Sequence, residues 1–326
     1  MSYVLGSGSK LYMKMKSAPY NYAQPQYFEL PFVSESLNPN ADFINSNNMS
    51  VGRSTGIGEK GNVAADGSFE SELSFHDLPY LLAGALGSVT YDFSSTLEGT
   101  ITPNASELPV YDVVVRHGAG TSMPITFTDT QINSLKMSLV SNAVLTATVD
   151  LVGIDYSLTD AVTGEQAMDT SILMYPSVLS SLKVGAIDLL TEVVSFDFTI
   201  ANNISTDLSR LDGAGRIALI PGELNITGSF EAILSGDDPL TLKTADVGTE
   251  LGNIEVIFQH PTDADDYIKL TFYNVYITSI SHDVNDRGVV RVNVEFGAFK
   301  DASNDPLEVE FKNTAGSIYL PIKEEE

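Results

Sequence analysis

The sequence predicts an all-β protein with minor α content, built from two tandem copies of one domain. Polar and apolar residues alternate along several segments, and turns rich in Gly, Asn and Asp separate these segments. A frame of Gly-x5-Gly-Ser-Phe-Glu occurs at residues 61–70 and again at 222–231, a displacement of 161 residues in a chain of 326. Self-similarity at about half the chain length indicates duplication.

A second repeat supports the duplication. Residues 125–151 align without gaps to residues 270–296, at an offset of 145. The identical pairs are Thr126/Thr271, Phe127/Phe272, Ile132/Ile277, Ser134/Ser279, Val144/Val289 and Val149/Val294. We therefore predict one domain at 1–160, a second at 161–310, and a C-terminal strand with an acidic tail at 311–326.

The drop in offset from 161 to 145 places about 16 extra residues in the first copy. They fall at 88–109, which is rich in Ser, Thr, Gly and Pro. This composition is typical of a loop, and we expect a long surface loop there.

Individual elements follow from periodicity. Phe69, Leu73 and Phe75 alternate with polar residues and predict a strand. Residues 77–87 predict a short helix, capped by Asp77 and ended by Gly87. The two long aligned segments each predict a β-hairpin, with turns at 141–143 and 285–288.

Residues 54–73 include Gly56-x-Gly58-x-x-Gly61, the spacing of a dinucleotide-binding loop. That loop needs a buried strand before the glycines and a helix directly after them. Here a polar stretch precedes them and an alternating strand follows. The sequence therefore favours a glycine-rich connection between strands.

Composition restricts the possible functions. The formal charge is −26, the chain has no Cys and four His, and no segment approaches the length of a membrane span. We expect a soluble protein without a signal peptide, disulfide or metal cluster, and one that polyanions such as nucleic acids and anionic membranes repel.

Candidate catalytic and metal groups have simpler interpretations. Asp263, Asp265 and Asp266 lack calcium-loop spacing and predict a solvated turn. His117 and His260 end the similar segments YDVVVRH and IEVIFQH, so we interpret them as matching framework residues. We expect no catalytic, cofactor-binding or metal-binding residues, no cofactor, and no enzyme activity.

Several segments resemble the tail tube (major tail) proteins of long-tailed bacteriophages. Residues 45–56 and 61–87 resemble the first half of that family, a polar loop followed by a Gly-Ser strand and a short helix. Residues 193–208 and 219–234 resemble its second half, and residues 268–298 its closing hairpin. The resemblance implies a β-sandwich or partial barrel with a flanking helix, and an assembly of stacked rings that conducts DNA during ejection.

The family plan has one domain per chain and six chains per ring, and this chain departs from it by carrying two domains. Three chains would then supply six domains, giving a homotrimeric, pseudo-hexameric ring. The resemblance also implies that the protein binds itself, the tail tip or initiator and tail terminator proteins, and, without tight binding, the tape-measure protein and DNA in the lumen. It implies no membrane partner, assembly in the host cytoplasm, and a final location in the virion tail.

Two alternatives remain open on the sequence alone. Another virion assembly protein, such as a capsid or baseplate component, shares the composition and acidity. A carbohydrate-binding β-sandwich or hydrolase is a second class, although the chain has no Trp to stack on sugars and retains 14 Tyr.

Two groups of residues are the candidate functional sites of a tube protein. We expect polar loops to contact the next ring, and the candidates are Asn47, Asn48, Arg53, Gly56, Gly58, Gly61, Asn202, Asn203, Gly213, Gly215 and Gly222. We expect acidic residues opposite the apolar face of strands to line the lumen, and the candidates are Glu70, Glu72, Asp150, Glu231 and Glu295.

Overall fold

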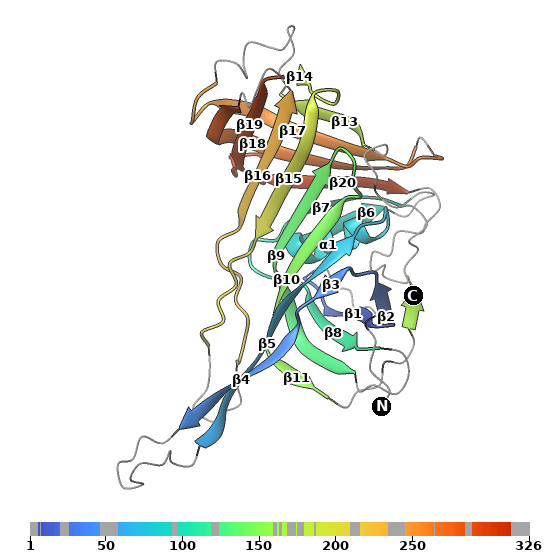
Figure 1. Cartoon of the computed structure of the whole chain (residues 1–326), viewed down its shortest axis with the longest axis vertical. Helices are drawn as coiled ribbons and strands as arrows, with labels where there is room; N and C mark the ends of the chain where they lie inside the picture. Colours follow the sequence, from blue (N-terminus) through green and yellow to red (C-terminus); the bar gives the residue numbers. More distant parts are fainter. Residues whose placement is uncertain are drawn as a thin grey trace.

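The computed structural model describes residues 6, 8–19, 26–45, 58–92, 97–118, 124–158, 162, 165–167, 174, 179–185, 187–208, 216–233, 245–263, 265–283 and 289–313. Within these ranges the fold is nearly all β with one helix, which confirms the predicted fold class. Figure 1 shows the strands running side by side along the long axis, from an arm at one end to a second layer of strands at the other.

The first half of the chain forms two sheets that share one strand. In the first sheet, β3 (Ser34–Glu35) and β4 (Asn38–Asn45) pair with β5 (Gly58–Glu72), followed by β10 (Thr146–Gly153) and the later part of β9 (Ile125–Val140). In the second sheet, the early part of β9 pairs with β8 (Val110–Arg116) and β11 (Asp155–Ser157), and β1 (Lys10–Ser17) joins β8 to β2 (Tyr27–Leu30).

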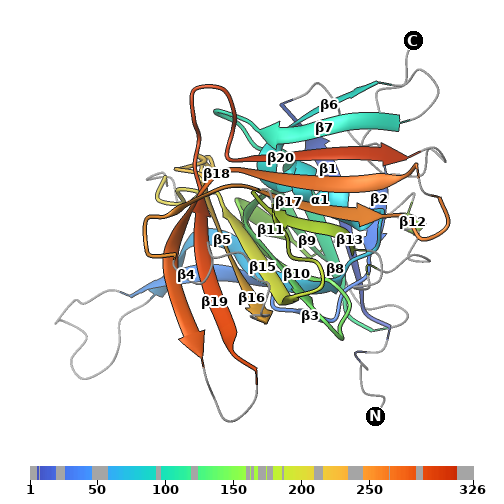
Figure 2. The same ribbon diagram turned by 90° about the horizontal axis from the view of Figure 1, so that it is seen from above.

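The second half has the same arrangement. Its first sheet runs from β15 (Val193–Ala201) through β16 (Asn225–Ile233) and β19 (Arg291–Ala298) to the later part of β18 (Tyr267–Asp283). In its second sheet, the early part of β18 lies between β17 (Glu250–Gln259) and β20 (Leu307–Asn313), with β13 (Leu179–Val184) and β14 (Ile187–Asp188) beyond β17. In Figure 2, β13, β17, β18 and β20 lie side by side as one layer.

Strand register in the two halves repeats at the offsets found in the sequence. Phe69 pairs with Val149 in the first half, and Phe230 pairs with Val294 in the second. The register shift on β9 that follows Asp150 recurs on β18 after Glu295. A second register shift is shared by the pairing of β8 with β9 and the pairing of β17 with β18. A residue with left-handed backbone conformation lies at each shift, Asp129 with φ of 53° and Asn274, 145 residues later, with φ of 51°.

The register corrects one sequence alignment. In the first half, Tyr111 faces Thr130 and Val113 faces Phe127. In the second half, Gly252 faces Val275 and Ile254 faces Phe272. β8 therefore corresponds to β17 at an offset of 141. At that offset His117 corresponds to Phe258. The predicted match of His117 with His260 was therefore wrong by two residues.

The insertion at 88–109 is only partly a loop, which corrects the prediction. β6 (Gly87–Asp92) and β7 (Leu97–Pro103) form a hairpin, and β7 pairs with β20 of the second half. The alternation of Val89 and Tyr91 with polar residues is a strand signal that the Ser, Thr and Pro content masked. This hairpin ties the two halves together, because it extends the second half's sheet with strands from the first (Figure 2).

The only helix in the described ranges is α1 (Asp77–Leu86), and it is buried along its whole length. Gly87 ends it in the left-handed conformation, as predicted, and donates its N–H to the Ala83 carbonyl. The predicted cap was wrong, since His76 takes the N-cap position and Asp77 lies in the first turn. The Asp77 carboxylate accepts a hydrogen bond of 2.6 Å from the Ser74 hydroxyl, which holds the chain leading into the helix.

The apolar faces of the sheets form one continuous core that spans both halves. In the second half four phenylalanines, Phe196, Phe198, Phe272 and Phe296, pack with ring centroids 5.2 to 6.1 Å apart. Such edge and offset contacts stabilise a core beyond the area that they bury.

One further element, β12, connects the halves. β12 (Glu165–Ala167) pairs in parallel with β2, so the segment after the first half returns along it. Glu165 accepts hydrogen bonds from Arg116 (2.9 Å) and from the Tyr12 hydroxyl (3.0 Å). Burial raises the pKa of Tyr12, so its hydroxyl stays protonated and able to donate at neutral pH.

Candidate assembly interface

The first sheets of the two halves join edge to edge within the chain. The later part of β9 pairs with β15 in antiparallel register, from Ser134 opposite Ala201 to Val140 opposite Ser195. Each half contributes four strand positions, with β3 and β4 together occupying one, so eight positions form one uninterrupted sheet (Figure 1). We call the pairing of β9 with β15 the internal joint.

Both outer edges of this sheet lack a partner strand among the described residues. At one edge β3 and β4 pair with β5 on one side alone. At the other, residues 278–283 of β18 pair with β19 on one side alone. Unpaired edges template further strand pairing, and Pro39 at the first of them is a typical device that limits promiscuous pairing.

One face of the joined sheet is buried in the core and the other is polar. Strand alternation places small hydroxyl side chains and charged groups on this polar face. On the six strands between the two edges, the face includes Ser68, Glu70, Glu72, Ser134, Lys136, Ser138, Thr146, Thr148, Asp150, Ser195, Asp197, Thr199, Thr227, Ser229, Glu231, Arg291, Asn293 and Glu295. Six of these eighteen residues are acidic and two are basic, so together they carry a formal charge of −4.

All five predicted lumen acids lie on this polar face, brought together from both halves. Glu72 and Glu295 are exposed. Glu231 accepts a hydrogen bond of 2.7 Å from Arg291, and Asp150 accepts one of 2.8 Å from Asn133. The sequence analysis missed Asp197, which the alternation of β15 identifies by the same rule.

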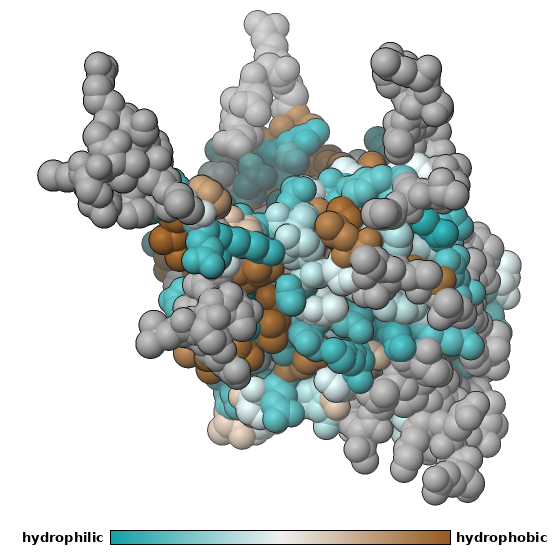
Figure 3. Space-filling model, turned by 90° about the horizontal axis from the view of Figure 1, so that it is seen from below, coloured by the Kyte–Doolittle hydropathy of each residue, from teal (hydrophilic) through white to brown (hydrophobic). Residues whose placement is uncertain are grey.

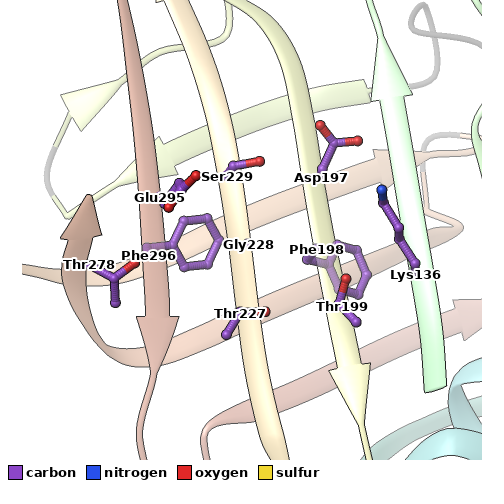
Figure 4. A pocket seen from close by; sticks show the side chains of 10 residues that line it. All are labelled: Lys136, Asp197, Phe198, Thr199, Thr227, Gly228, Ser229, Thr278, Glu295 and Phe296. Carbon is purple, nitrogen blue, oxygen red and sulfur yellow. The ribbon is translucent and has the colours of Figure 1, made fainter. Parts of the chain in front are cut away.

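A shallow hollow of about 420 Å³ lies on the polar face of the second half. Figure 4 shows Lys136, Asp197 and Glu295 around it, from three different strands. The hydroxyl groups of Thr199, Thr227, Ser229 and Thr278 also line the hollow.

The structure divides the predicted ring-contact residues into three groups. Asn47, Asn48, Arg53, Gly56, Gly213 and Gly215 lie outside the described residues. Gly58 and Gly61 belong to β5, so the strand begins earlier than predicted, and Asn203 and Gly222 are exposed. Asn202 is 4% exposed, which corrects its assignment as a contact residue.

Asn202 supports the internal joint. Its amide donates hydrogen bonds to the carbonyl oxygens of Ala85 (3.0 Å) and Ile132 (2.9 Å), connecting the end of β15 to α1 and β9. Both acceptors are buried with it. A buried carbonyl that loses its donor carries a desolvation cost.

We expect Asn202→Ala to lower the free energy of unfolding by about 1–3 kcal/mol, because two buried carbonyls would lose their donor. Urea unfolding of the free subunit, followed by circular dichroism, measures this change. Asn225→Ala, at an exposed asparagine of the neighbouring strand, is the matched control and should shift stability by less than about 0.5 kcal/mol. An equal effect of the two substitutions would contradict the supporting role.

The remaining candidates have structural roles. His117 forms an ion pair of 2.9 Å with Glu35 when it is protonated. His260 packs edge-on against the Phe75 ring and accepts hydrogen bonds from the Thr262 and Asp263 N–H groups through Nδ1. Asp263 accepts a hydrogen bond from the Asp265 N–H, as in a turn. Over the described ranges no group of three or more His, Asp or Glu is placed to hold a metal ion.

Within the described ranges, the joined sheet has a continuous polar face and an outer edge at each end that pairs with no further strand. Such edges are typical of proteins that associate by pairing strands. Comparison with known families gives the particular class: the model of the phage tail tube protein family matches residues 6–298. The chain belongs to that family and is a structural component of the virion tail. No curated protein matches the chain at a significant level. No helix in the described part of the chain is long and apolar enough to cross a membrane.

Proposed function

We propose that three copies of the chain close a ring, and that stacked rings form the tail tube through which DNA is ejected. The internal joint carries this proposal. β9 corresponds in register to β18. β15 corresponds to the β3–β4 edge, because Ser195 faces Glu231 in the second half and Ser34 faces Glu70, 161 residues earlier, in the first. The edge of β18 that is unpaired therefore corresponds to the edge of β9 that β15 already occupies.

Repeating the internal joint between chains sets a definite register. Ala201 faces Ser134 in the joint, and the corresponding pair between chains is Asn40 of one copy with Ser279 of the next. Asn38 then faces Ser281. Three chains of eight strand positions each would form a closed barrel of 24, with no unpaired edge left.

In the proposed ring the polar face points inward. The core face of the joined sheet is covered by the second sheets and α1, so only the polar face can line an open bore. Hydroxyl groups and a net negative charge on that face suit a channel that DNA must cross without binding, since phosphates are repelled and few cations are available to hold them. Duplication of the domain explains how three chains fill the six domain positions of the family plan.

Stacking of rings requires contacts along the tube axis. The arm made by β4 and β5 extends beyond the rest of the sheet in Figure 1, and residues 46–57 are the segment of the chain that connects these two strands. Asn203 and Gly222, at the base of the corresponding segment of the second half, are exposed. We infer that these two segments contact the next ring, and that partners at the tube ends and in the lumen are the tail tip, terminator and tape-measure proteins.

The decisive experiment is symmetry analysis of assembled tubes by electron microscopy. We expect threefold rings in which the two halves alternate, with 24 strands around the bore. Six full chains per ring with true sixfold symmetry would contradict the proposal, because the internal joint would then not have the same role as the joint between chains.

A further inference from the structure

An apolar side chain on the arm is exposed at a position where its counterpart is buried. The register of β4 with β5 places Phe43 opposite Lys60, and Ile44 opposite Glu59. In the second half Ser205 faces Ile220. This pair corresponds to the pair of Ile44 and Glu59, because both of its residues lie 161 positions later in the chain. Phe43 therefore corresponds to Ile204. Phe43 is 67% exposed, whereas Ile204 is 8% exposed.

Ile204 is buried because it crosses the internal joint. It packs in a small cluster with Leu108 and Val152 of the first half, with Leu219 beside it. Arg216, on the same segment, donates hydrogen bonds to both carboxylate oxygens of Asp66 and to the Gly153 carbonyl. Ile204 therefore acts as an apolar anchor: just beyond the internal joint, its side chain packs the second half against the first.

The corresponding place on the other side of the chain carries an unpartnered aromatic patch. Val152 corresponds to Gly297, and the ring of Phe299 lies against Gly297 where a side chain would stand. Tyr276 faces Gly297 across the strands and packs edge-on with Phe299, their ring centroids 6.0 Å apart. Phe299 is 48% exposed, and Val247, in the adjoining turn, is 62% exposed. We call Tyr276 and Phe299 the aromatic patch.

The arm carries one large ring where the second half carries two aliphatic side chains. On the arm, the Phe43 ring leans over Gly58, which corresponds to Leu219, so one large ring takes the space of Ile204 and Leu219 together. Hydrophobic patches also interrupt the polar surface seen from below in Figure 3. Exposed apolar groups of this size typically mark contact sites in assembly proteins.

We propose that Phe43 of one chain packs on the aromatic patch of the next chain in the same ring, as the anchor that secures the joint between chains. This inference rests on the proposed ring, and it assigns Phe43, two residues before the end of β4, to a contact within a ring rather than between rings. The occupant of the patch is a second copy of the chain. Burial of Phe43 on the patch stabilises the strand pairing between chains.

Cysteine cross-linking tests the contact directly, because the chain contains no native Cys. Assembled Phe43→Cys/Phe299→Cys protein treated with a short bismaleimide should yield covalent species that end at trimers. Ile44→Cys/Phe299→Cys is the matched control and should cross-link weakly, since Ile44 is equally exposed at 64% but points to the other face of β4. Equal cross-linking of the two pairs would overturn the proposal.

A third pair separates failure of this contact from failure of the ring. Asn40→Cys/Ser279→Cys reports the strand pairing alone, and cross-strand neighbours lie within disulfide reach. If that pair links and the Phe43 pair does not, the ring stands and the anchor is wrong. If neither pair links in assembled tubes, the joint between chains is itself wrong, and the anchor falls with it.

Assembly energetics provide an independent measurement. Phe43→Ala should raise the concentration needed for ring formation about 10-fold or more, while Ile44→Ala should change it less than about 3-fold. Phe43→Ala combined with Phe299→Ala should cost little more than either alone, because both remove one contact. Additive losses, or equal losses at Phe43 and Ile44, would contradict the anchor, provided that thermal melting shows all variants folded.

Discussion

A chain carrying His282→Pro should fold but fail to form rings. In the internal joint, Asn202 donates its N–H to the Asn133 carbonyl and Ser141 donates to the Val194 carbonyl, so alternate residues of β9 bond to β15. On β18 the corresponding residues lie 145 positions later, and His282, which corresponds to Met137, is one of those whose backbone N–H points to the outer edge. Proline there removes one outward N–H and adds a ring at the edge, while the ladder to β19 keeps its donors.

The expected result is a monomer with unchanged secondary structure by circular dichroism and no tubes by negative stain. His282→Ala is the matched control, because it removes the imidazole and keeps the backbone N–H; it should assemble normally. His282 is exposed, so neither change disturbs the core. Tubes formed by the proline variant at the normal concentration would exclude this edge from the interface.

The sequence was sufficient to predict the class of fold and the correspondence of long strands, because both depend on local alternation. Phe69 and Phe230 occupy matching positions, as do Phe127 and Phe272, and each faces an equivalent partner in its own half. Alternation also placed Glu70 and Glu295 on the polar face correctly. These are properties that one strand carries without reference to its neighbours.

Features that depend on pairing between distant strands were not predicted. The β6–β7 hairpin pairs with β20, about 200 residues later in the chain, and nothing local indicates this partner. The burial of Asn202 depends on carbonyls of α1 and β9. The offset of 141 for β8 was missed because the match of two His residues outweighed the alternation of apolar residues.

The candidate interface illustrates the same limit. Phe43 and Ile44 are adjacent apolar residues in a polar segment, and the sequence gives no reason to prefer either. Register distinguishes them, since one corresponds to a buried Ile and the other to an exposed Ser. An interface that repeats an internal contact can therefore be located only after the internal contact is known.

Reversing charge on the polar face should slow DNA ejection without preventing tube assembly. Glu72 and Glu295 are the best positions, because both are exposed. Glu231 accepts a hydrogen bond from Arg291, and Asp150 accepts one from Asn133, so substitution there would also remove these contacts. Glu72→Lys/Glu295→Lys would change the formal charge of the eighteen polar-face residues on the six inner strands by four units per chain, from −4 to 0, and would present ammonium groups to passing phosphates. Those groups act within a Debye length of about 8–10 Å.

Two controls isolate the effect of added cations in the bore. Glu72→Gln/Glu295→Gln removes the negative charges without supplying a partner for phosphate, so it should slow ejection far less than the lysine variant. Glu308→Lys places a cation on the outward side of β20, in the second sheet, and should leave ejection unchanged. Because attraction between lysine and phosphate is screened by salt, the lysine variant should recover as ionic strength rises. Ejection from virions shown to carry the altered tube is the measurement, and a normal rate at low salt would place Glu72 and Glu295 outside the bore.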